Sequence, residues 1–366
     1  MPRLHDRATP VFNLTRTELE PIVEELAGEP IASFEVAVED QLPGHYGYGA
    51  EKLVPTITYS TVSNKRGTAK LFVKWSDEPG PREAHHYEHL ARHQAPVPRL
   101  YGALVSSDRR EMIFLELLQP VHDLHPFDRV MKRRSQFPAF LRTAARFNAV
   151  QPSAEYAARL RNVASPDLSE WHEKVNGTLD GIWQYASTGD LGQHMRELCA
   201  SAVAKRPALL KRARRLVEPL SDMPTGLTHN DFYPDSVGKR EATGELLLVD
   251  LESVGVGPRF ADVARWIGPP DDIRPRCFPR RHLAQCYLEE YAQCGGNCPP
   301  LSRFLEETRL LWVWQTFDML WFRLHRSLDG RVDWTEDRDE GRRVYQADLY
   351  RELKALLAQA HGGSRD

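Results

Sequence analysis

The sequence lacks the features of a membrane, secreted or nucleic-acid-binding protein. No hydrophobic run in its 366 residues approaches the length of a membrane span, and the opening MPRLHDRATPVFNL has no hydrophobic core of a signal peptide. Basic and acidic residues nearly balance, 48 against 51, so there is no basic surplus for binding nucleic acid. We therefore expect no membrane and no nucleic-acid partner, and a cytoplasmic location.

Cysteine is also scarce and odd in number, which argues against a disulfide scaffold. The five cysteines are Cys199, Cys277, Cys286, Cys294 and Cys298. Cys294 and Cys298, with Cys286 and His282 nearby in the sequence, leave a zinc site open. Their spacing is not that of the usual C-x-x-C pair, and Cys286 falls within a helical pattern. Ordinary thiols are the favoured interpretation.

The first third of the chain predicts a small sheet with two helices. A helix over 16–26, capped by Thr15, precedes strands over 32–42, 55–62 and 69–75. A helix over 83–93 and strands over 100–106 and 111–117 follow. The turn between the first two strands contains Gly44, Gly47 and Gly49, which suit either a plain turn or close approach to phosphates.

The rest of the chain has mainly helical periodicity. The pattern predicts helices over 138–150, 168–183, 192–204, 207–220, 259–267, 281–293, 301–327 and 336–360. Their one interruption is a loop and short hairpin over 226–250. The distribution indicates an α+β protein with a sheet-containing first part and a helical remainder.

This interruption contains two carboxylates in a suggestive arrangement. Asp231 stands two residues after His229, and Asp250 ends the hydrophobic run Leu246–Val249. A buried strand that ends on a carboxylate places that charge at a rim, where it can meet a metal or a substrate. Two such carboxylates suit phosphoryl transfer, in which one orients a hydroxyl and the other holds Mg²⁺.

The same residues resemble the aminoglycoside phosphotransferase and choline kinase family. THNDFYPDSV and LLLVDLESVGVGPRFADVA are similar to its H-G-D-x-x-x-x-N segment and to the strand, D-x-[DE] motif and Gly-containing turn that follow. Asn230 stands where the family usually has Gly, and Ser236 where it usually has a metal-binding Asn. The matching residues are His229, Asp231, Asp250, Glu252, Gly257 and Asp262.

The resemblance implies a two-lobe protein-kinase-like fold. Residues 1–119 would form a small nucleotide-binding lobe with an antiparallel sheet, and 120–366 a larger, mostly helical lobe with the catalytic loop and acceptor site. It further implies transfer of the γ-phosphoryl group of ATP, with Mg²⁺, to a hydroxyl of a small molecule such as an aminoglycoside, amino alcohol or sugar. Nucleotide and acceptor would be the partners.

The resemblance also assigns roles. Asp231 would orient or deprotonate the acceptor hydroxyl, His229 would support the catalytic loop, and Asp262 would tether it. Lys74 would contact the nucleotide phosphates, braced by Glu83, with Glu88 at another helical angle as its competitor. Gly47 and Gly49 would cover the phosphates; the backbone of Glu116 and Leu118 would bind the adenine, and Phe114 would close its pocket. Asp250, Ser236 and Glu252 would form the metal site.

Ser236 is the main departure from the family pattern. A serine hydroxyl is a weaker Mg²⁺ ligand than an asparagine amide oxygen. Asp235 or a bridging water could substitute for it. Otherwise metal binding would be impaired, and the protein would be a degenerate kinase that binds nucleotide or serves as a scaffold.

The acceptor site is less defined. In the helix over 301–327, Trp314, Asp318 and Trp321 share one face with Phe317 and could surround an ammonium-bearing or sugar substrate. The same aromatics also suit core packing, which is the favoured alternative. The sequence lacks a dense acidic cluster, which weakens the case for a polycationic aminoglycoside.

Overall fold

The structure, a computed structural model, describes residues 11–41, 50–76, 83–106, 110–121, 134–162, 168–188, 193–269, 271, 278–330 and 338–361. Its contacts group the chain into two compact units. The first, which we call the sheet unit, is Met1–Thr143 with Tyr233–Ser253; the second, the helical unit, is Ala144–Phe232 with Val254–Asp366. The predicted division after Gln119 remains a prediction.

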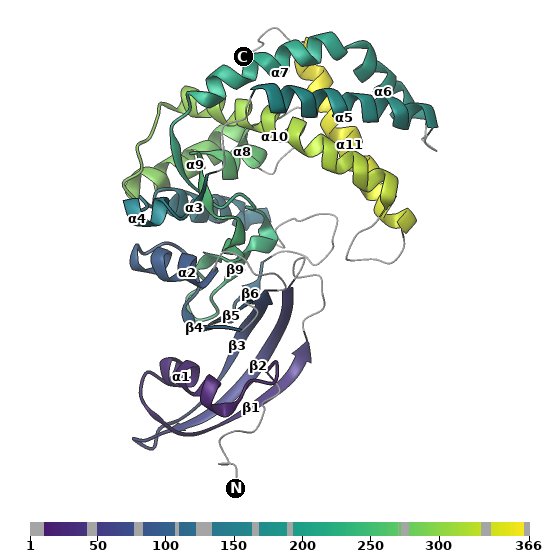
Figure 1. Ribbon diagram of the computed structural model, residues 1–366. Helices are drawn as coiled ribbons and strands as arrows, with labels where there is room; N and C mark the ends of the chain where they lie inside the picture. Colours follow the sequence, from purple (N-terminus) through teal and green to yellow (C-terminus); the bar gives the residue numbers. More distant parts are fainter. Residues whose placement is uncertain are drawn as a thin grey trace. The chain divides into compact units, whose positions relative to one another are not determined.

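The sheet unit is built on five antiparallel strands in the order β1-β2-β3-β5-β4 (Figure 1). These are β1 (Ile31–Gln41), β2 (Ala50–Thr61), β3 (Arg66–Ser76), β4 (Leu100–Val105) and β5 (Glu111–Glu116). Helix α1 (Arg16–Ala27) precedes them and begins with a capping box, in which Thr15 and Glu18 each bond the other's backbone N–H. Helix α2 (Glu83–Arg92) follows β3.

The two faces of this sheet differ in chemistry. Leu71 and Val73 of β3, Leu53 of β2 and Phe114 of β5 belong to a buried hydrophobic core that also includes residues of α1. Alternate residues of a strand point to opposite faces. Lys74 therefore lies on the face opposite this core, and that face carries the charged residues of the site.

A short three-stranded sheet completes the sheet unit. It has the order β10-β9-β6, from β6 (Gln119–Pro120), β9 (Val237–Lys239) and β10 (Leu246–Leu248). The 3-10 turns η4 (Pro234–Ser236) and η5 (Leu251–Ser253) flank the β9–β10 hairpin. The turn η3 (Arg134–Gln136) leads into α3 (Phe137–Asn148), within which the helical unit begins.

Helix α10 (Leu301–Asp329) is central to the helical unit and packs on α5, α7, α8, α9 and α11 (Figure 1). The other helices are α4 (Ala154–Ala157), α5 (Leu168–Thr188), α6 (Gln193–Ala204), α7 (Arg206–Ser221), α8 (Ala261–Ile267), α9 (Arg280–Gln293) and α11 (Arg338–His361). A small sheet in the order β7-β11-β8 joins β7 (Arg161–Asn162), β8 (Thr225–Thr228) and β11 (Gly255–Pro258). This sheet leads directly into the predicted catalytic loop.

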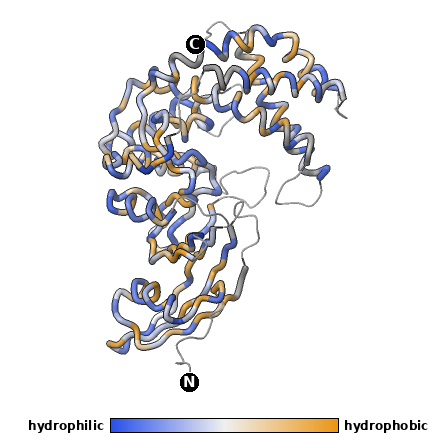
Figure 2. The backbone as a smooth tube through the Cα atoms, viewed as in Figure 1, coloured by the Kyte–Doolittle hydropathy of each residue, from blue (hydrophilic) through white to orange (hydrophobic). Residues whose placement is uncertain are grey.

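Figure 2 shows hydrophilic and hydrophobic residues interleaved along the helices of the helical unit. Among the residues that the structure describes, no helix is long and apolar enough to cross a membrane.

Candidate active site

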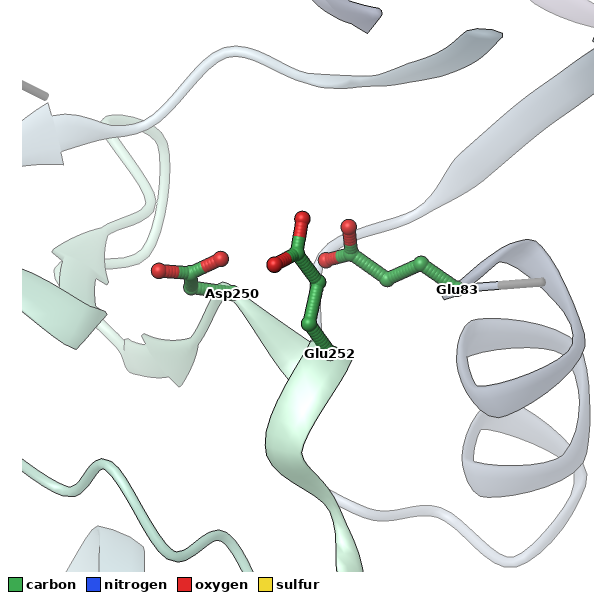
Figure 3. A group of neighbouring side chains, drawn as sticks. All are labelled: Glu83, Asp250 and Glu252. Carbon is green, nitrogen blue, oxygen red and sulfur yellow. The ribbon is translucent and has the colours of Figure 1, made fainter. Parts of the chain in front are cut away.

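A buried lysine at the centre of three carboxylates is the main feature of the sheet unit. The Nζ atom of Lys74 lies 2.9 Å from Glu83 Oε2, 2.7 Å from Asp250 Oδ1 and 2.6 Å from Glu252 Oε1. Figure 3 shows these three carboxylates turned toward one another, Glu83 from α2 and the other two from the segment after β10. Burial lowers the pKa of Lys74, but the three carboxylates outweigh it and hold the pKa above its ordinary value.

Glu83 has a second set of bonds that orders the segment around Asp250. Its Oε1 accepts the backbone N–H of Leu251 at 2.9 Å and the hydroxyl of Tyr87 at 3.2 Å. The same hydroxyl accepts the backbone N–H of Asp250 at 3.2 Å. Asp250 has φ of 63°, a left-handed conformation that costs energy for a residue with a side chain. The buried bonds of Glu83 and Tyr87 help to hold it there.

Ser236 and Asp250 occupy the same end of the β9–β10 hairpin. Val237 pairs with Leu248, and one step beyond, Val249 donates its N–H to Ser236 O at 3.0 Å. Ser236 is buried, whereas Asp235 is exposed. Among the described residues, the group that gathers three potential metal-ligand atoms within 4.8 Å of one another is Glu83, Asp250 and Glu252. The role of Ser236 at a metal therefore stays a prediction.

The predicted catalytic loop belongs to the helical unit and is tied down by Asp262 of α8. Its carboxylate accepts the backbone N–H of His229 at 2.8 Å and of Asn230 at 2.9 Å. His229 is fully buried, and its Nδ1 accepts the N–H of Asp231 at 3.3 Å. Asn230 has φ of 66°, which explains why glycine suits this position and why asparagine, the side chain that best tolerates this conformation, can replace it.

Asn148 at the end of α3 extends this network. Its Nδ2 donates to Asp262 Oδ2 at 2.7 Å and to Leu227 O at 2.9 Å, while its Oδ1 accepts the hydroxyl of Tyr287 at 3.0 Å. Both N–H donors of this buried amide thus hold β8 and Asp262, and its oxygen is bonded to α9. Asp231 itself is half-buried at the end of the tethered segment. The geometry agrees with support by His229 and Asp262 and leaves Asp231 as the candidate catalytic group.

At the end of β5 the structure corrects one expectation. Phe114 pairs with Val73, so it shares the hydrophobic-core face and not the face of Lys74, and it is fully buried in that core. It therefore does not close a pocket on the Lys74 face. Ile113, which pairs with Lys74, and Leu115 two residues on occupy that face instead. The sequence shows that alternate residues of β5 point to opposite faces, but which of them face the core depends on the register of β5 with β3.

Glu116 and Leu118 are positioned by the small sheet. The backbone N–H of Glu116 is taken by Arg99 O at 2.9 Å, and its carboxylate binds Arg240 of the hairpin through Nε at 2.7 Å and Nη2 at 3.0 Å. Leu118 packs on Gly238, where an added Cβ would lie 2.5 Å from the Leu118 Cβ. Adenine binding by the backbone of these residues stays a prediction. Gly47 and Gly49 lie outside the described residues.

The predicted acceptor residues lie on α10. Trp314 and Asp318 are half-buried, whereas Phe317 on the same face is 2% exposed and belongs to the packed interior. The side chain of Trp321 lies outside the described part. Phe317 is therefore a core residue, as the packing alternative predicts. The role of Trp314, Asp318 and Trp321 in binding substrate stays a prediction.

The suggested zinc ligands do not assemble. Cys286 and His282 approach each other at 3.6 Å on α9, but Cys294 and Cys298 are exposed free thiols. Among the described residues, no group of three that includes a cysteine or histidine has metal-ligand spacing. These cysteines are ordinary thiols, while Cys277 lies outside the described residues.

Lys52 of β2 is a site residue that was not predicted from the sequence. It pairs directly with Lys74 in the strand register, so both side chains leave the same face of the sheet. Burial lowers the pKa of Lys52, the charge of Asp250 acts in the opposite direction, and the charge of Lys74 adds to the lowering. Lys52 lies before the predicted strand over 55–62, whereas β2 begins at Ala50, so the sequence pattern did not mark this lysine.

Comparison with known proteins identifies the family. Residues 69–296 match the profile of the phosphotransferase enzyme family. The fold is shared with a candidate aminoglycoside phosphotransferase of Ralstonia eutropha JMP134, at 13% identity and a TM-score of 0.51 over 92% of this chain and 97% of that one. No curated protein matches the sequence.

Two further solved structures are more distant. They are an ethanolamine kinase of Plasmodium vivax (10% identity, TM-score 0.47, 87% of this chain and 82% of that one) and a macrolide 2'-phosphotransferase of Brachybacterium faecium (14% identity, TM-score 0.44, 91% and 98%). The family profile covers more than half of this chain, including Lys74, the tethered loop and Asp250. The chain therefore belongs to the phosphotransferase enzyme family and is a small-molecule phosphotransferase with a kinase-like α+β fold.

Proposed function

We propose that the protein transfers the γ-phosphoryl group of ATP to a hydroxyl of a small molecule, with Mg²⁺. The observation that carries the proposal is the buried Lys74, held at 2.6–2.9 Å from Glu83, Asp250 and Glu252. A lysine braced by a glutamate beside an aspartate is the arrangement that protein-kinase-like enzymes use to bind Mg·ATP. Of the acceptor classes, an amino alcohol or a sugar-like compound is favoured over a polycationic aminoglycoside.

The donor set fits a hard divalent cation. The carboxylate oxygens of Asp250 and Glu252 lie within 4.8 Å of each other and of Glu83, and oxygen is the ligand atom that Mg²⁺ prefers. All three carboxylates bind Lys74, but the side chains of Asp250 and Glu252 are 40% and 48% exposed, whereas that of Glu83 is buried. Asp250 and Glu252 would hold the ion, which when bound neutralises charge on the β- and γ-phosphates.

In the transfer, the acceptor oxygen forms a bond to the γ-phosphorus as the bond from that phosphorus to the β–γ bridging oxygen breaks, which leaves ADP. Asp231 orients the acceptor hydroxyl and takes its proton late, because an ordinary carboxylate is a weak base for an alcohol. The bonds accepted by Asp262 and by His229 fix the backbone N–H groups of the two residues before Asp231 and of Asp231 itself. Preorganisation of this loop is the contribution of the helical unit.

The test is Asp231→Asn, which keeps the size of the side chain and removes its charge. We expect phosphoryl transfer to fall by about 100-fold or more, within the range that general-base and orienting groups contribute. Binding of Mg·ATP, measured by calorimetry, should be retained. Undiminished transfer in the variant would remove Asp231 from its proposed role.

The alternative, a degenerate kinase that binds nucleotide without transfer, is favoured by Ser236 at the position of the usual asparagine. Ser236→Asn restores the usual ligand at the hairpin end that also carries Asp250. We expect the variant to keep or raise activity and to need less Mg²⁺ for half-maximal rate. A wild-type protein that binds Mg·ATP but transfers phosphate to no hydroxyl compound in a broad panel would support the degenerate alternative.

A further inference from the structure

A second lysine stands beside Lys74 on the charged face of the sheet. Lys52 of β2 is the direct cross-strand partner of Lys74 of β3, and directly opposed residues have Cβ atoms about 5 Å apart on the same face. Lys52 is half-buried, and its neighbour Leu53 points into the hydrophobic core on the other face. The charge of Lys52 is therefore held at the site and not left on an open surface.

The bonding of Lys74 is already complete. A protonated lysine has three N–H donors. Those of Lys74 face three carboxylate oxygens, on Glu83, Asp250 and Glu252, at 2.9, 2.7 and 2.6 Å. To contact a phosphate oxygen, Lys74 would have to release one of these partners. Lys52, by contrast, has no carboxylate to release in the part of the chain that the structure describes.

Lys52 is placed differently with respect to the same carboxylates. It interacts electrostatically with Asp250, Glu252 and Glu83, yet among the described residues no carboxylate lies within ion-pair distance of its Nζ. Its donors thus remain open to a ligand. Two lysines and three carboxylates also leave this face with a surplus of negative charge, so a highly anionic ligand needs a cation that is not already neutralised.

We propose that Lys52 is a second phosphate-binding residue beside Lys74, whose ammonium donates to non-bridging oxygens of the nucleotide triphosphate. This role deepens the proposed function and rests on it. In the sequence, Lys52 follows Gly49 by three residues, directly after the turn predicted to approach the phosphates. Lys52 would then add a second cation to the phosphate site beside Lys74.

The rival explanation is that Lys52 is only a counter-charge for Asp250 and Glu252. The two roles differ in their dependence on phosphate number. A phosphate-binding lysine contributes to ATP more than to ADP and not to adenosine. A counter-charge acts on the ion that Asp250 and Glu252 would hold, so its loss weakens ATP only when Mg²⁺ is present, and it lowers the thermal stability of the ligand-free protein.

The experiment measures dissociation constants of ATP, ADP and adenosine by calorimetry, with Mg²⁺ and with a chelator in its place, for the wild type, Lys52→Met and Lys52→Arg. We expect Lys52→Met to weaken ATP about 10- to 100-fold, the size of a charge-assisted hydrogen bond, and to weaken ADP less. Adenosine binding should be unchanged, and Lys52→Arg should restore much of the affinity for ATP. The matched control is Lys65→Met on the β2–β3 turn, where the side chain is 77% exposed and its pairing with Glu29 is worth little.

Three other outcomes would each decide against the proposed role of Lys52. If the wild type binds Mg·ATP but Lys52→Met weakens ATP no more than Lys65→Met does, the role of Lys52 is overturned and the proposed function stands. Weakening of ATP with Mg²⁺ but not with the chelator, together with a lower melting temperature, assigns Lys52 to the structural role instead. If the wild type binds no nucleotide, the proposed function fails and this role with it.

Discussion

At the scale of single residues, the candidate site depends on carboxylates that serve as acceptors for several donors at once. Asp262 accepts three N–H groups, from the backbones of His229 and Asn230 and from Asn148 Nδ2. An asparagine at this position offers one acceptor oxygen and two donors, so at least one buried N–H would face another donor. The charge of Asp262 is what makes the tethered loop possible.

Asp262→Asn should therefore loosen the loop that carries Asp231. We expect a loss of about 1–3 kcal/mol in the free energy of unfolding, the usual penalty for an unsatisfied buried donor. The turnover number should also fall, while the dissociation constant of Mg·ATP stays unchanged because the nucleotide-binding candidates belong to the other unit. Denaturant unfolding measures the change in stability, and activity and binding assays measure the turnover number and the dissociation constant.

The matched control is Asp222→Asn, an exposed carboxyl three residues before β8 in the same unit. It makes the same chemical change without touching the network. An Asp262→Asn variant with wild-type turnover would show that the backbone bonds of the loop are not needed for catalysis.

In the sheet unit, Tyr87 has a positioning role like that of Asp262 in the helical unit. Its hydroxyl joins Glu83 to the backbone N–H of Asp250 at 3.2 Å on each side. Tyr87→Phe keeps the ring in the core and leaves that N–H without its acceptor. Because Asp250 is in a left-handed conformation, we expect its carboxylate to be less well positioned.

The expected result for Tyr87→Phe is a Mg²⁺ requirement raised about 3- to 10-fold, the loss of one neutral hydrogen bond. Affinity for adenosine should not change. Half-maximal Mg²⁺ concentrations from activity titrations test this, with Tyr101→Phe on β4 as the control hydroxyl deletion. Equal Mg²⁺ curves for wild type and Tyr87→Phe would contradict the positioning role.

At the scale of elements, the β9–β10 hairpin is anchored to the end of β5 by the ion pair of Arg240 with Glu116. Burial raises the pKa of the Glu116 carboxyl, but the bonds from Arg240 and the N–H of Arg99 outweigh burial, and the pKa lies below the ordinary 4.5. A carboxyl whose pKa is lower in the folded than in the unfolded protein stabilises the fold above the unfolded value. That stabilisation is lost as pH falls through the folded value.

Glu116→Gln should consequently cost about 1–2 kcal/mol in unfolding free energy at pH 7, the size of a partly buried charged hydrogen bond. The difference from wild type should shrink as pH falls below 4.5. Urea unfolding at a series of pH values measures this. A difference that stays constant, or grows, toward acid pH would rule out the ion pair as its source.

Most long helices and strands could be predicted from the sequence, but the short strands could not. Helix α1 begins at Arg16, as the cap at Thr15 predicts, and most of the other long helices and main strands lie close to their predicted ranges, because periodicity and end signals are local. Strand β2 is an exception, since it begins at Ala50 and its predicted range begins at residue 55. The short strands β6, β7, β8 and β11 could not be predicted individually. Each has two to four residues and exists only through pairing with distant segments.

The site residues also divide into those that could be predicted from the sequence and those that could not. The resemblance to the family predicted the pairing of Lys74 with Glu83, the loop at Asp231 and the strand ending at Asp250. The facing of Phe114 and the pairing of Lys52 with Lys74 were not, because a shift of one residue in register exchanges the two faces of a strand. The bonds of Tyr87 and Asn148 join segments far apart in the chain and have no local signature.

At the scale of the whole molecule, the chain passes between its two units at Thr143–Ala144, Phe232–Tyr233 and Ser253–Val254. The segment Tyr233–Ser253 thus returns to the sheet unit and brings it β9, β10 and Asp250. Neither unit is a continuous stretch, so neither can be cut out with all its candidate residues. Ligand binding to the sheet unit is best tested on the full chain.

Mg·ATP should stabilise the full chain against heat more than ATP with a chelator does. A ligand at about a hundred times its dissociation constant adds roughly 2.7 kcal/mol to the free energy of unfolding, which raises the melting temperature measurably. In Asp250→Asn the two conditions should give the same melting temperature, because the carboxylate that would hold the ion is gone. The control Asp235→Asn, next to Ser236 and exposed, should keep the difference; if it instead loses the difference while Asp250→Asn keeps it, the metal is held by Asp235 and the assignment of Asp250 is wrong.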